Sequence, residues 1–151
     1  MQRALVVAFA LVVSSGCGKK DKDKAAPSGK PSDLAESATK DIADLKAAIT
    51  AKNTNRGYAI CSVANTSMLR LKSAEPALAA ELTKLCTREV PLVEMNRALE
   101  RLEEARKLKP TGAIMECTGL KNYKKPLEKG GFGADPEVVA LETRWLAACP
   151  K

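Results

Sequence analysis

The chain has 151 residues and a formal net charge of +7, from 25 lysines and arginines against 18 aspartates and glutamates. It contains no histidine, which excludes mechanisms that use imidazole as a base or a metal ligand, including Ser-His-Asp triads, Cys-His pairs and H-E-x-x-H zinc sites. Chemistry by carboxylates or lysine remains open.

The amino terminus has the pattern of an export signal. Arg3 is followed by an apolar run at positions 4–13 and then by Ser14-Ser15-Gly16-Cys17. The run is too short to span a bilayer, which takes roughly 20 residues. Residues 1–16 are therefore expected to form a signal peptide that is removed from the mature protein.

The end of this pattern resembles the processing site of bacterial lipoproteins. Ser15 and Gly16 match the small residues that precede the cysteine in that family, whereas Ser14 stands where the family more often has an aliphatic residue. The resemblance covers residues 1–17 alone. It implies that signal peptidase II cleaves before Cys17, that the Cys17 thiol carries a diacylglyceryl group, and that the new amino terminus is acylated. The alternative is an ordinary secretory signal, which would leave Cys17 as an unpaired thiol.

Residues 17–32 are predicted to be the lipidated cysteine and a disordered tether. Positions 18–32 hold five lysines, two aspartates and no large apolar residue, so they cannot bury enough surface to offset the entropy of ordering. A flexible segment of this length reaches roughly 20 Å. The resemblance implies a location in the bacterial cell envelope, anchored to a membrane through the lipid. It favours the outer membrane, because Gly18 stands where an aspartate would signal retention in the inner membrane.

The charge of the remaining chain is close to balanced. Residues 33–151 carry 19 basic and 16 acidic residues, so more than half of the excess positive charge precedes them. Aromatic residues, which stack on bases, make up 3% of the chain. Together with the export signal, these features predict no nucleic-acid partner.

Residues 33–151 are predicted to form one all-α domain, a small antiparallel bundle of four to five helices stapled by two disulfides. The composition is rich in Ala, Leu, Glu, Lys and Arg and lacks alternating apolar patterns. A first helix is expected to begin at Asp33, with Glu36 at capping-box spacing, and to end near Asn53. Its apolar residues share one face, at positions 34, 38, 42, 45 and 49.

Prolines and glycines delimit the later helices. A second helix is expected over residues 56–71, and Pro76 fits the first turn of a third that extends to residue 110 and is kinked or divided at Pro91. A fourth is expected over residues 112–125 and is ended by Pro126. Glycines at 130, 131 and 133 indicate a loop, and Asp135 caps a fifth helix that ends near residue 149.

Leucine recurs every seven residues, at positions 71, 78, 85, 92 and 99. Such a repeat is typical of a coiled coil, but the prolines at 76 and 91 interrupt the register. An intramolecular core is therefore the favoured interpretation. The sequence does not determine the oligomeric state.

Cys61, Cys86, Cys117 and Cys149 fall on four different predicted helices. In an oxidising compartment an even number of cysteines favours disulfides. If the chain folds back about residue 73, Cys61 lies twelve residues before the turn and Cys86 thirteen after it; about residue 133, Cys117 and Cys149 each lie sixteen residues away. We therefore predict the disulfides Cys61–Cys86 and Cys117–Cys149. No two of these cysteines are closer than 25 positions, which disfavours a zinc or redox site, so no metal or cofactor is expected.

Glutamates on the later helices are the candidates for catalysis. Paired carboxylates of this kind hydrolyse glycans. Arginines and lysines interleave the glutamates of the third helix, which favours a solvated, ion-paired face instead. The candidates are Glu94, Glu100, Glu103, Glu104, Glu116 and Glu142.

A second candidate site gathers lysines and aromatics near the turn between the last two helices. We refer to it as the basic hairpin tip. Its residues are a candidate docking site for an envelope protein, an acidic glycan or a lipid headgroup. The alternative is a basic helix end, where lysines complement the helix dipole. The basic hairpin tip consists of Lys121, Tyr123, Lys124, Lys125, Lys129 and Phe132.

These features predict a lipid-anchored cell-envelope protein with a non-enzymatic binding or structural role and no catalytic residues. A carboxylate-based hydrolase of cell-wall glycan is the alternative. A third interpretation is an accessory subunit whose apolar groove is completed by a partner protein.

Overall fold

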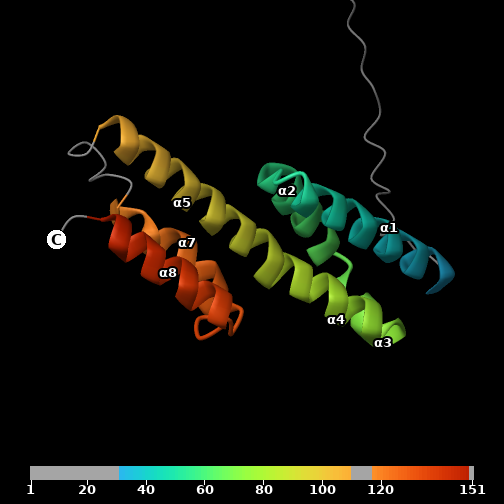
Figure 1. Ribbon diagram of the computed structural model, residues 1–151. Helices are drawn as coiled ribbons and strands as arrows, with labels where there is room; N and C mark the ends of the chain where they lie inside the picture. The colour runs from blue at the N-terminus through green and yellow to red at the C-terminus, as the bar shows by residue number, and fades with distance from the viewer. Residues whose placement is uncertain (1–30, 110–116, 150–151) are drawn as a thin grey trace, which may run out of the picture.

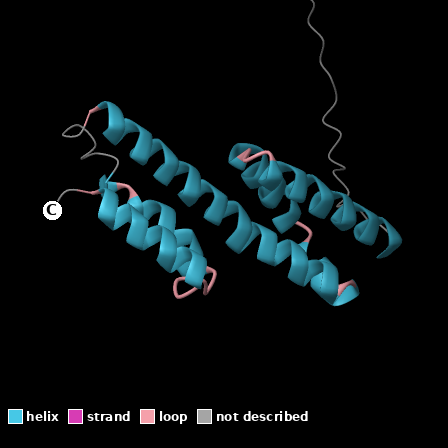
Figure 2. Cartoon of the chain, in the orientation of Figure 1, coloured by secondary structure: helices cyan, strands magenta, loops and turns pink. Residues whose placement is uncertain are grey.

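The computed structural model describes residues 31–109 and 117–149, and this part of the chain is helical, without a strand (Figures 1 and 2). The predicted all-α class is confirmed. The signal peptide, Cys17 and the tether up to residue 30 lie outside the described residues, as does Glu116. None of the helices within the described ranges is both long and apolar enough to cross a bilayer.

The amino-terminal half of the fold consists of α1 (Pro31–Thr50), α2 (Thr54–Asn65), α3 (Met68–Ala74) and α4 (Pro76–Lys84). The predicted apolar face of α1 is confirmed, because its central residues are buried. They pack with α2, α3 and α4 in one hydrophobic cluster, the amino-terminal core. Its buried members are Ala38, Ile42, Leu45, Ala64, Leu71, Ala79, Leu82, Leu85 and Val90.

The prediction of a single helix over residues 56–71 is wrong, because the helix breaks between α2 and α3. At the break the hydroxyl of Thr66 donates to the carbonyl of Val63 at 2.7 Å, and that of Ser67 donates to the carbonyl of Ala64 at 3.1 Å. Hydroxyl groups that bond to nearby carbonyls compete with the helical ladder. The two short helices that result bring Met68 and Leu71 toward the amino-terminal core.

The third predicted helix divides near Pro91, as expected, but the division is a change of winding within one long rod. A π-helical turn, η1 (Leu85–Glu89), joins α4 to α5 (Val90–Leu108). Proline has no N–H and its ring clashes with the carbonyl four residues earlier, here that of Thr87. In the π turn the N–H of Val90 bonds instead to the carbonyl of Leu85, five residues back. The wider turn accommodates the proline without ending the rod.

The carboxy-terminal half packs α7 (Leu120–Lys129) and α8 (Pro136–Ala148) against α5. Figure 1 shows this pair on one side of the long rod and α1 and α2 on the other. A second hydrophobic cluster, the carboxy-terminal core, fills the space between α5, α7 and α8. Its buried members are Leu92, Met95, Ala98, Leu99, Leu102, Leu127, Val138, Leu141 and Trp145.

Pro126 does not end its helix, contrary to the sequence prediction. The helix continues to Lys129, and the N–H of Gly130 bonds to the carbonyl of Pro126 at 3.0 Å. Proline within a helix costs about 3 kcal/mol. The proline penalty opposes formation of the last helical turn, and this turn contains Leu127, which is fully buried in the carboxy-terminal core. Burial of a leucine contributes roughly 1.5–3 kcal/mol and offsets most of the penalty.

Both predicted disulfides are confirmed, Cys61–Cys86 and Cys117–Cys149, each with a Cα–Cα distance of 5.6 Å. The first ties α2 to η1, and the second ties the residues before α7 to the end of α8. The leucine repeat is intramolecular: Leu71 and Leu85 belong to the amino-terminal core, whereas Leu92 and Leu99 belong to the carboxy-terminal core. The loop at 130–133 and the Asp135 cap are also as expected, with the Asp135 carboxylate accepting from the N–H of Glu137 at 3.0 Å.

Gly130 lies at a close contact between the loop and the long rod. A Cβ atom at this position would stand 2.9 Å from the backbone oxygen of Thr87, so we expect Gly130→Ala to lower the free energy of unfolding by about 1–3 kcal/mol. Gly133→Ala is the matched control, because its Cβ would meet the side-chain Cγ of Glu128 at 3.0 Å and backbone only at 3.6 Å, an ordinary van der Waals distance. It is expected to change stability by less than about 1 kcal/mol. Denaturant unfolding of both oxidised variants measures the difference, and equal losses would contradict the close-contact explanation.

Candidate functional site

The structure divides the basic hairpin tip into inward and outward side chains. On α7, Tyr123 packs its ring against that of Trp145, with the ring centroids 5.6 Å apart, beside the carboxy-terminal core. Lys121, Lys125 and Lys129 are exposed. They recur every four residues, so they follow one another along one face of the helix. We call these three residues the α7 lysine stripe.

Lys124 belongs to the internal packing rather than to the stripe. Its ammonium group donates to both carboxylate oxygens of Glu142 on α8, at 2.8 and 2.9 Å, and lies 3.5 Å from Glu128. The hydrogen bond to Glu142 is the main reason why the pKa of Lys124 is raised. Lys124 therefore joins α7 to α8, and its charge is already compensated.

Phe132 lies apart from the stripe, because the loop folds its ring back beside the long rod. The ring is half-buried and packs against the carboxy-terminal core. It also lines a hollow together with Thr83 and Thr87 of the rod. Of the six predicted residues, the structure thus brings together three exposed lysines and assigns Tyr123, Lys124 and Phe132 to packing contacts.

The lysine stripe has no compensating acid among the described residues. None of its three ammonium groups forms an ion pair there, whereas Lys46 pairs with Glu81 and Lys52 with Glu100, each at 2.7 Å. Like charges four residues apart on a helix repel one another. The outer face of α7 is therefore a concentrated positive charge that an external anion would stabilise.

Arg88 organises a charge cluster that the sequence did not indicate. Its guanidinium group, in the π turn, contacts the carboxylates of Glu89 at 2.7 Å, Asp135 at 2.9 Å and Glu137 at 2.7 Å. The hydrogen bond to Glu137 is the largest of the effects that raise the pKa of Arg88 above its ordinary value. Burial alone would raise the pKa of Asp135, but the hydrogen bond from Arg88 and those from the N–H groups of Glu137 and Val138 lower it. The cluster fastens the 130–135 loop and the start of α8 to the centre of the rod.

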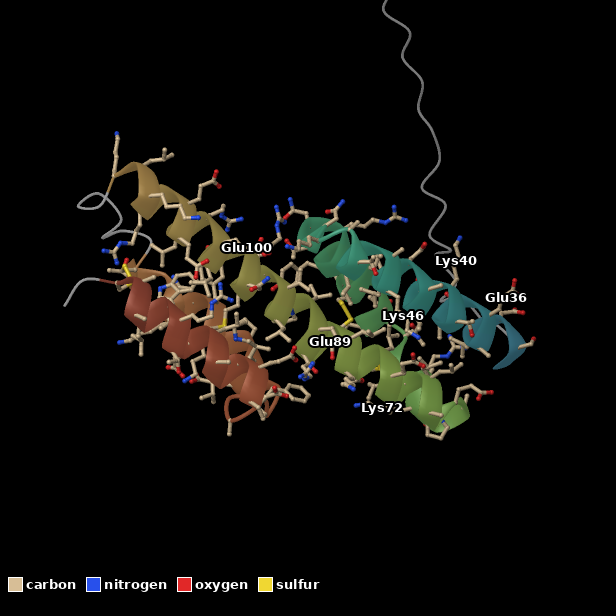
Figure 3. The ribbon with its side chains drawn as sticks, in the orientation of Figure 1. Glu36, Lys40, Lys46, Lys72, Glu89 and Glu100 are labelled. Carbon is tan, nitrogen blue, oxygen red and sulfur yellow. A yellow bond between two sulfur atoms is a disulfide. The ribbon has the colours of Figure 1, made fainter. Side chains whose placement is uncertain are left out.

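Three of the candidate catalytic glutamates are placed in ion pairs. Glu100, on the long rod in Figure 3, pairs with Lys52, and this hydrogen bond is the main cause of its lowered pKa. Glu103 pairs with Arg144 at 2.9 Å, and Glu142 pairs with Lys124. A glycosidase needs one carboxyl group that stays protonated near neutral pH. The Glu100 carboxyl, with its lowered pKa, does not meet this requirement.

One carboxyl group does have a raised pKa, that of Asp41 on α1. Burial is the main cause, and repulsion from Asp44 adds to it. Neither residue lines any of the larger hollows found in the described part of the molecule. Among the described residues no group of three or more cysteines, aspartates and glutamates is arranged to hold a metal ion.

Comparison of the chain with known protein families, with curated proteins and with solved structures gives no match. The functional assignment therefore rests on the residues and geometry of this molecule.

The Arg88 cluster makes stability depend on pH. Asp135 has a lowered pKa in the folded protein, so its contribution is present above the pKa of an unfolded aspartate, near 4, and is lost as the pH falls through the folded value. We expect Arg88→Met to lower the free energy of unfolding at pH 7. The difference from the unmodified protein is expected to narrow as the pH is lowered toward about 2.5.

Denaturant unfolding at several pH values measures this difference. Arg144→Met is the control, because its pair with Glu103 is exposed and such pairs contribute at most about 1 kcal/mol. A deficit for Arg88→Met that stays constant over the acid range would rule out Asp135 as a charged partner.

Proposed function

We propose that the protein is a lipid-anchored, non-enzymatic docking domain of the bacterial cell envelope, with the outer membrane as its favoured location. The anchor is supported by the lipoprotein-like sequence Ser14-Ser15-Gly16-Cys17. Several acyl chains would bind a membrane stably, since two membrane-binding signals suffice. The chain then requires no membrane-spanning helix.

The observation that carries the docking role is the row of three exposed lysines on one face of α7, without ion pairs to other described residues. The candidate catalytic carboxylates Glu100, Glu103 and Glu142 are each bound to a basic side chain. The α7 lysine stripe has no such partner among these residues. Surface charge that is not compensated internally steers and binds partners of opposite sign. We infer that the stripe docks to acidic groups of the envelope.

The anchor is tested by replacing Cys17 with Ser in the full-length chain. In a bacterial host that processes lipoproteins, the unmodified chain is expected in the membrane fraction, with an intact mass that lacks residues 1–16 and includes acyl chains. The Cys17→Ser chain is expected to lose the acyl mass and to leave the membrane fraction. Recovery of the unmodified chain as an unacylated soluble protein would refute the anchor.

The stripe is tested by Lys121→Glu, Lys125→Glu and Lys129→Glu together, in the Cys17→Ser background so that the lipid does not contribute. We expect the triple variant to lose most of its binding to anionic vesicles and to an acidic polysaccharide resin, because surface attraction falls when the charge is reversed. A control variant with the same change in net charge carries Glu at Lys40, Lys107 and Lys109, which are exposed and lack ion pairs in the described structure. Equal losses in the two variants would show that net charge, not the stripe, determines binding.

A further inference from the structure

Two hollows join on the face of the rod that carries the first disulfide. One, of about 410 Å³, lies between α4, η1 and the loop that holds Phe132; the other, of about 380 Å³, lies between α2 and the rod and reaches Tyr58. They share Lys72, Thr83 and Thr87, so they form one open depression, which we call the rod groove. Phe132 lies in one half and Tyr58 in the other.

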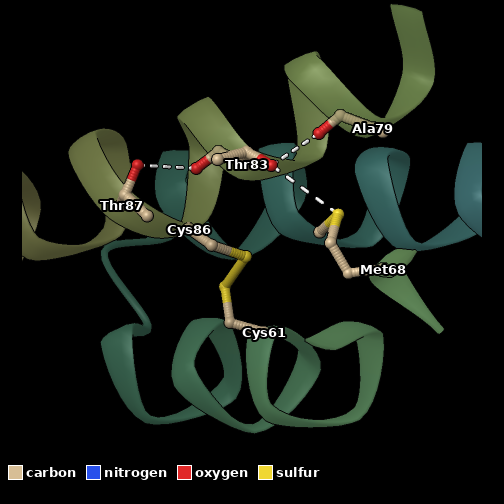
Figure 4. Close-up of a disulfide and its surroundings, with 6 residues drawn as sticks. All are labelled: Cys61, Met68, Ala79, Thr83, Cys86 and Thr87. Carbon is tan, nitrogen blue, oxygen red and sulfur yellow. Dashed lines mark hydrogen bonds between the residues drawn. A yellow bond between two sulfur atoms is a disulfide. The ribbon is translucent and has the colours of Figure 1, made fainter. Parts of the chain in front are cut away.

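The floor of the rod groove is held rigidly. Figure 4 shows the disulfide Cys61–Cys86 between α2 and the rod, near Thr83 and Thr87, whose hydroxyl groups bond to carbonyls of the rod. Thr83 donates to the carbonyl of Ala79 at 2.7 Å and contacts the sulfur of Met68 at 3.6 Å, and Thr87 donates to the carbonyl of Thr83 at 2.8 Å. Because their hydroxyl groups are already bonded, Thr83 and Thr87 contribute mainly their methyl groups to the groove. The floor is thus preformed and largely apolar.

The only charged residues that line the rod groove are Lys72 and Lys84. Both are exposed, and neither forms an ion pair within the described part of the chain. Lys72 lies on α3, at the edge of the rod (Figure 3). Two other hollows in the described part of the chain are lined by both signs of charge. One includes Lys52, Glu89 and Glu137, and the other, which Lys84 also lines, includes Glu81. The rod groove is therefore the apolar depression with a purely positive lining.

This charge determines what fits the groove. The chain's own tether carries five lysines against two aspartates, so it is repelled by Lys72 and Lys84. A bilayer presents a broad surface, whereas the groove is a depression that follows the rod. From Pro76 to Thr87 the rod advances about 17 Å, the length of about five residues of extended chain or three turns of helix. Partner segments of this size bind grooves through alternating apolar and polar side chains.

We propose that the rod groove docks an acidic, amphipathic segment of another envelope protein. Apolar side chains of the segment lie over Thr83, Thr87 and the disulfide, between the rings of Tyr58 and Phe132. Its carboxylates pair with Lys72 and Lys84. This proposal specifies the partner of the docking domain and therefore rests on the proposed function. The residues of the groove are distinct from the α7 lysine stripe and from Cys17.

The test uses the full mature chain, in detergent micelles, and a synthetic twelve-residue peptide that alternates glutamate with leucine or phenylalanine. We expect this peptide to bind with an affinity that decreases with added salt, and the same peptide with lysine in place of glutamate not to bind. The variant with Lys72→Glu and Lys84→Glu is expected to bind the acidic peptide with an affinity that is lower by a factor of about ten or more. The matched control, Lys40→Glu with Lys107→Glu, makes the same change in net charge at exposed lysines outside the groove and is expected to bind as the unmodified chain does.

A second variant fills the groove without changing its charge. Ala80 lines the groove and is exposed, so Ala80→Trp is expected to block the peptide while the protein remains folded. Equal binding of the acidic and basic peptides, or equal loss in the two charge variants, would overturn the groove proposal. Sedimentation that shows a dimer lost in the Lys72→Glu, Lys84→Glu variant would overturn it too, because the occupant would then be a second copy of the chain.

Membrane retention is measured on the same preparations and separates the two proposals. If a groove variant loses peptide binding while its acylated chain stays in the membrane fraction, the result bears on the groove proposal and leaves the anchor intact. An unacylated soluble chain that still binds the acidic peptide would refute the anchor and support the groove.

Discussion

The passage of one helical rod across Pro91 is the constraint on which the rest of the fold depends. Both hydrophobic cores are built on this rod, the amino-terminal one up to Val90 and the carboxy-terminal one from Leu92 onward. If Pro91 ended the helix, the two cores would lose their common support. The π turn at Leu85–Glu89 keeps the rod continuous by passing the N–H of Val90 to a carbonyl five residues back.

The same π turn explains why structural and surface contacts concentrate at the centre of the molecule. It carries Cys86, which holds α2, and Arg88, which holds the loop before α8. It also places the carbonyl of Thr87 so close to Gly130 that a side chain there would collide with it. A covalent bond, an ion cluster and a close backbone contact thus fix three segments to five consecutive residues. The rod groove adjoins this region, because Cys86 and Thr87 belong to its lining.

The sequence was informative where local rules and straight-helix geometry apply. The pairing of Cys61 with Cys86 followed from their near-equal distances to a turn, because a helix rises evenly with each residue. Prediction failed at Pro126, where burial of Leu127 outweighs a local rule, and at Thr66 and Ser67, whose hydroxyl groups break a helix that apolar spacing would continue. The Arg88 cluster joins residues 47 and 49 positions apart, and no local pattern encodes such a separation. Of the basic hairpin tip, sequence spacing identified the lysines but not which of them would be neutralised inside the fold.

The placement of ion pairs connects the fold to its proposed role. An acidic side chain in its lining would neutralise the rod groove, and the residues that line the groove include none. In this proposal, the five lysines of residues 18–32 disfavour occupation of the groove by the chain's own amino-terminal segment, because like charges repel. With the proposed lipid anchor and tether, which would reach roughly 20 Å, the groove would be confined to a thin layer above the membrane, and the effective concentration of a partner segment in that layer would rise. Weak individual contacts to exposed lysines would then suffice for binding, because the higher effective concentration of the partner near the membrane compensates for a low intrinsic affinity of the groove.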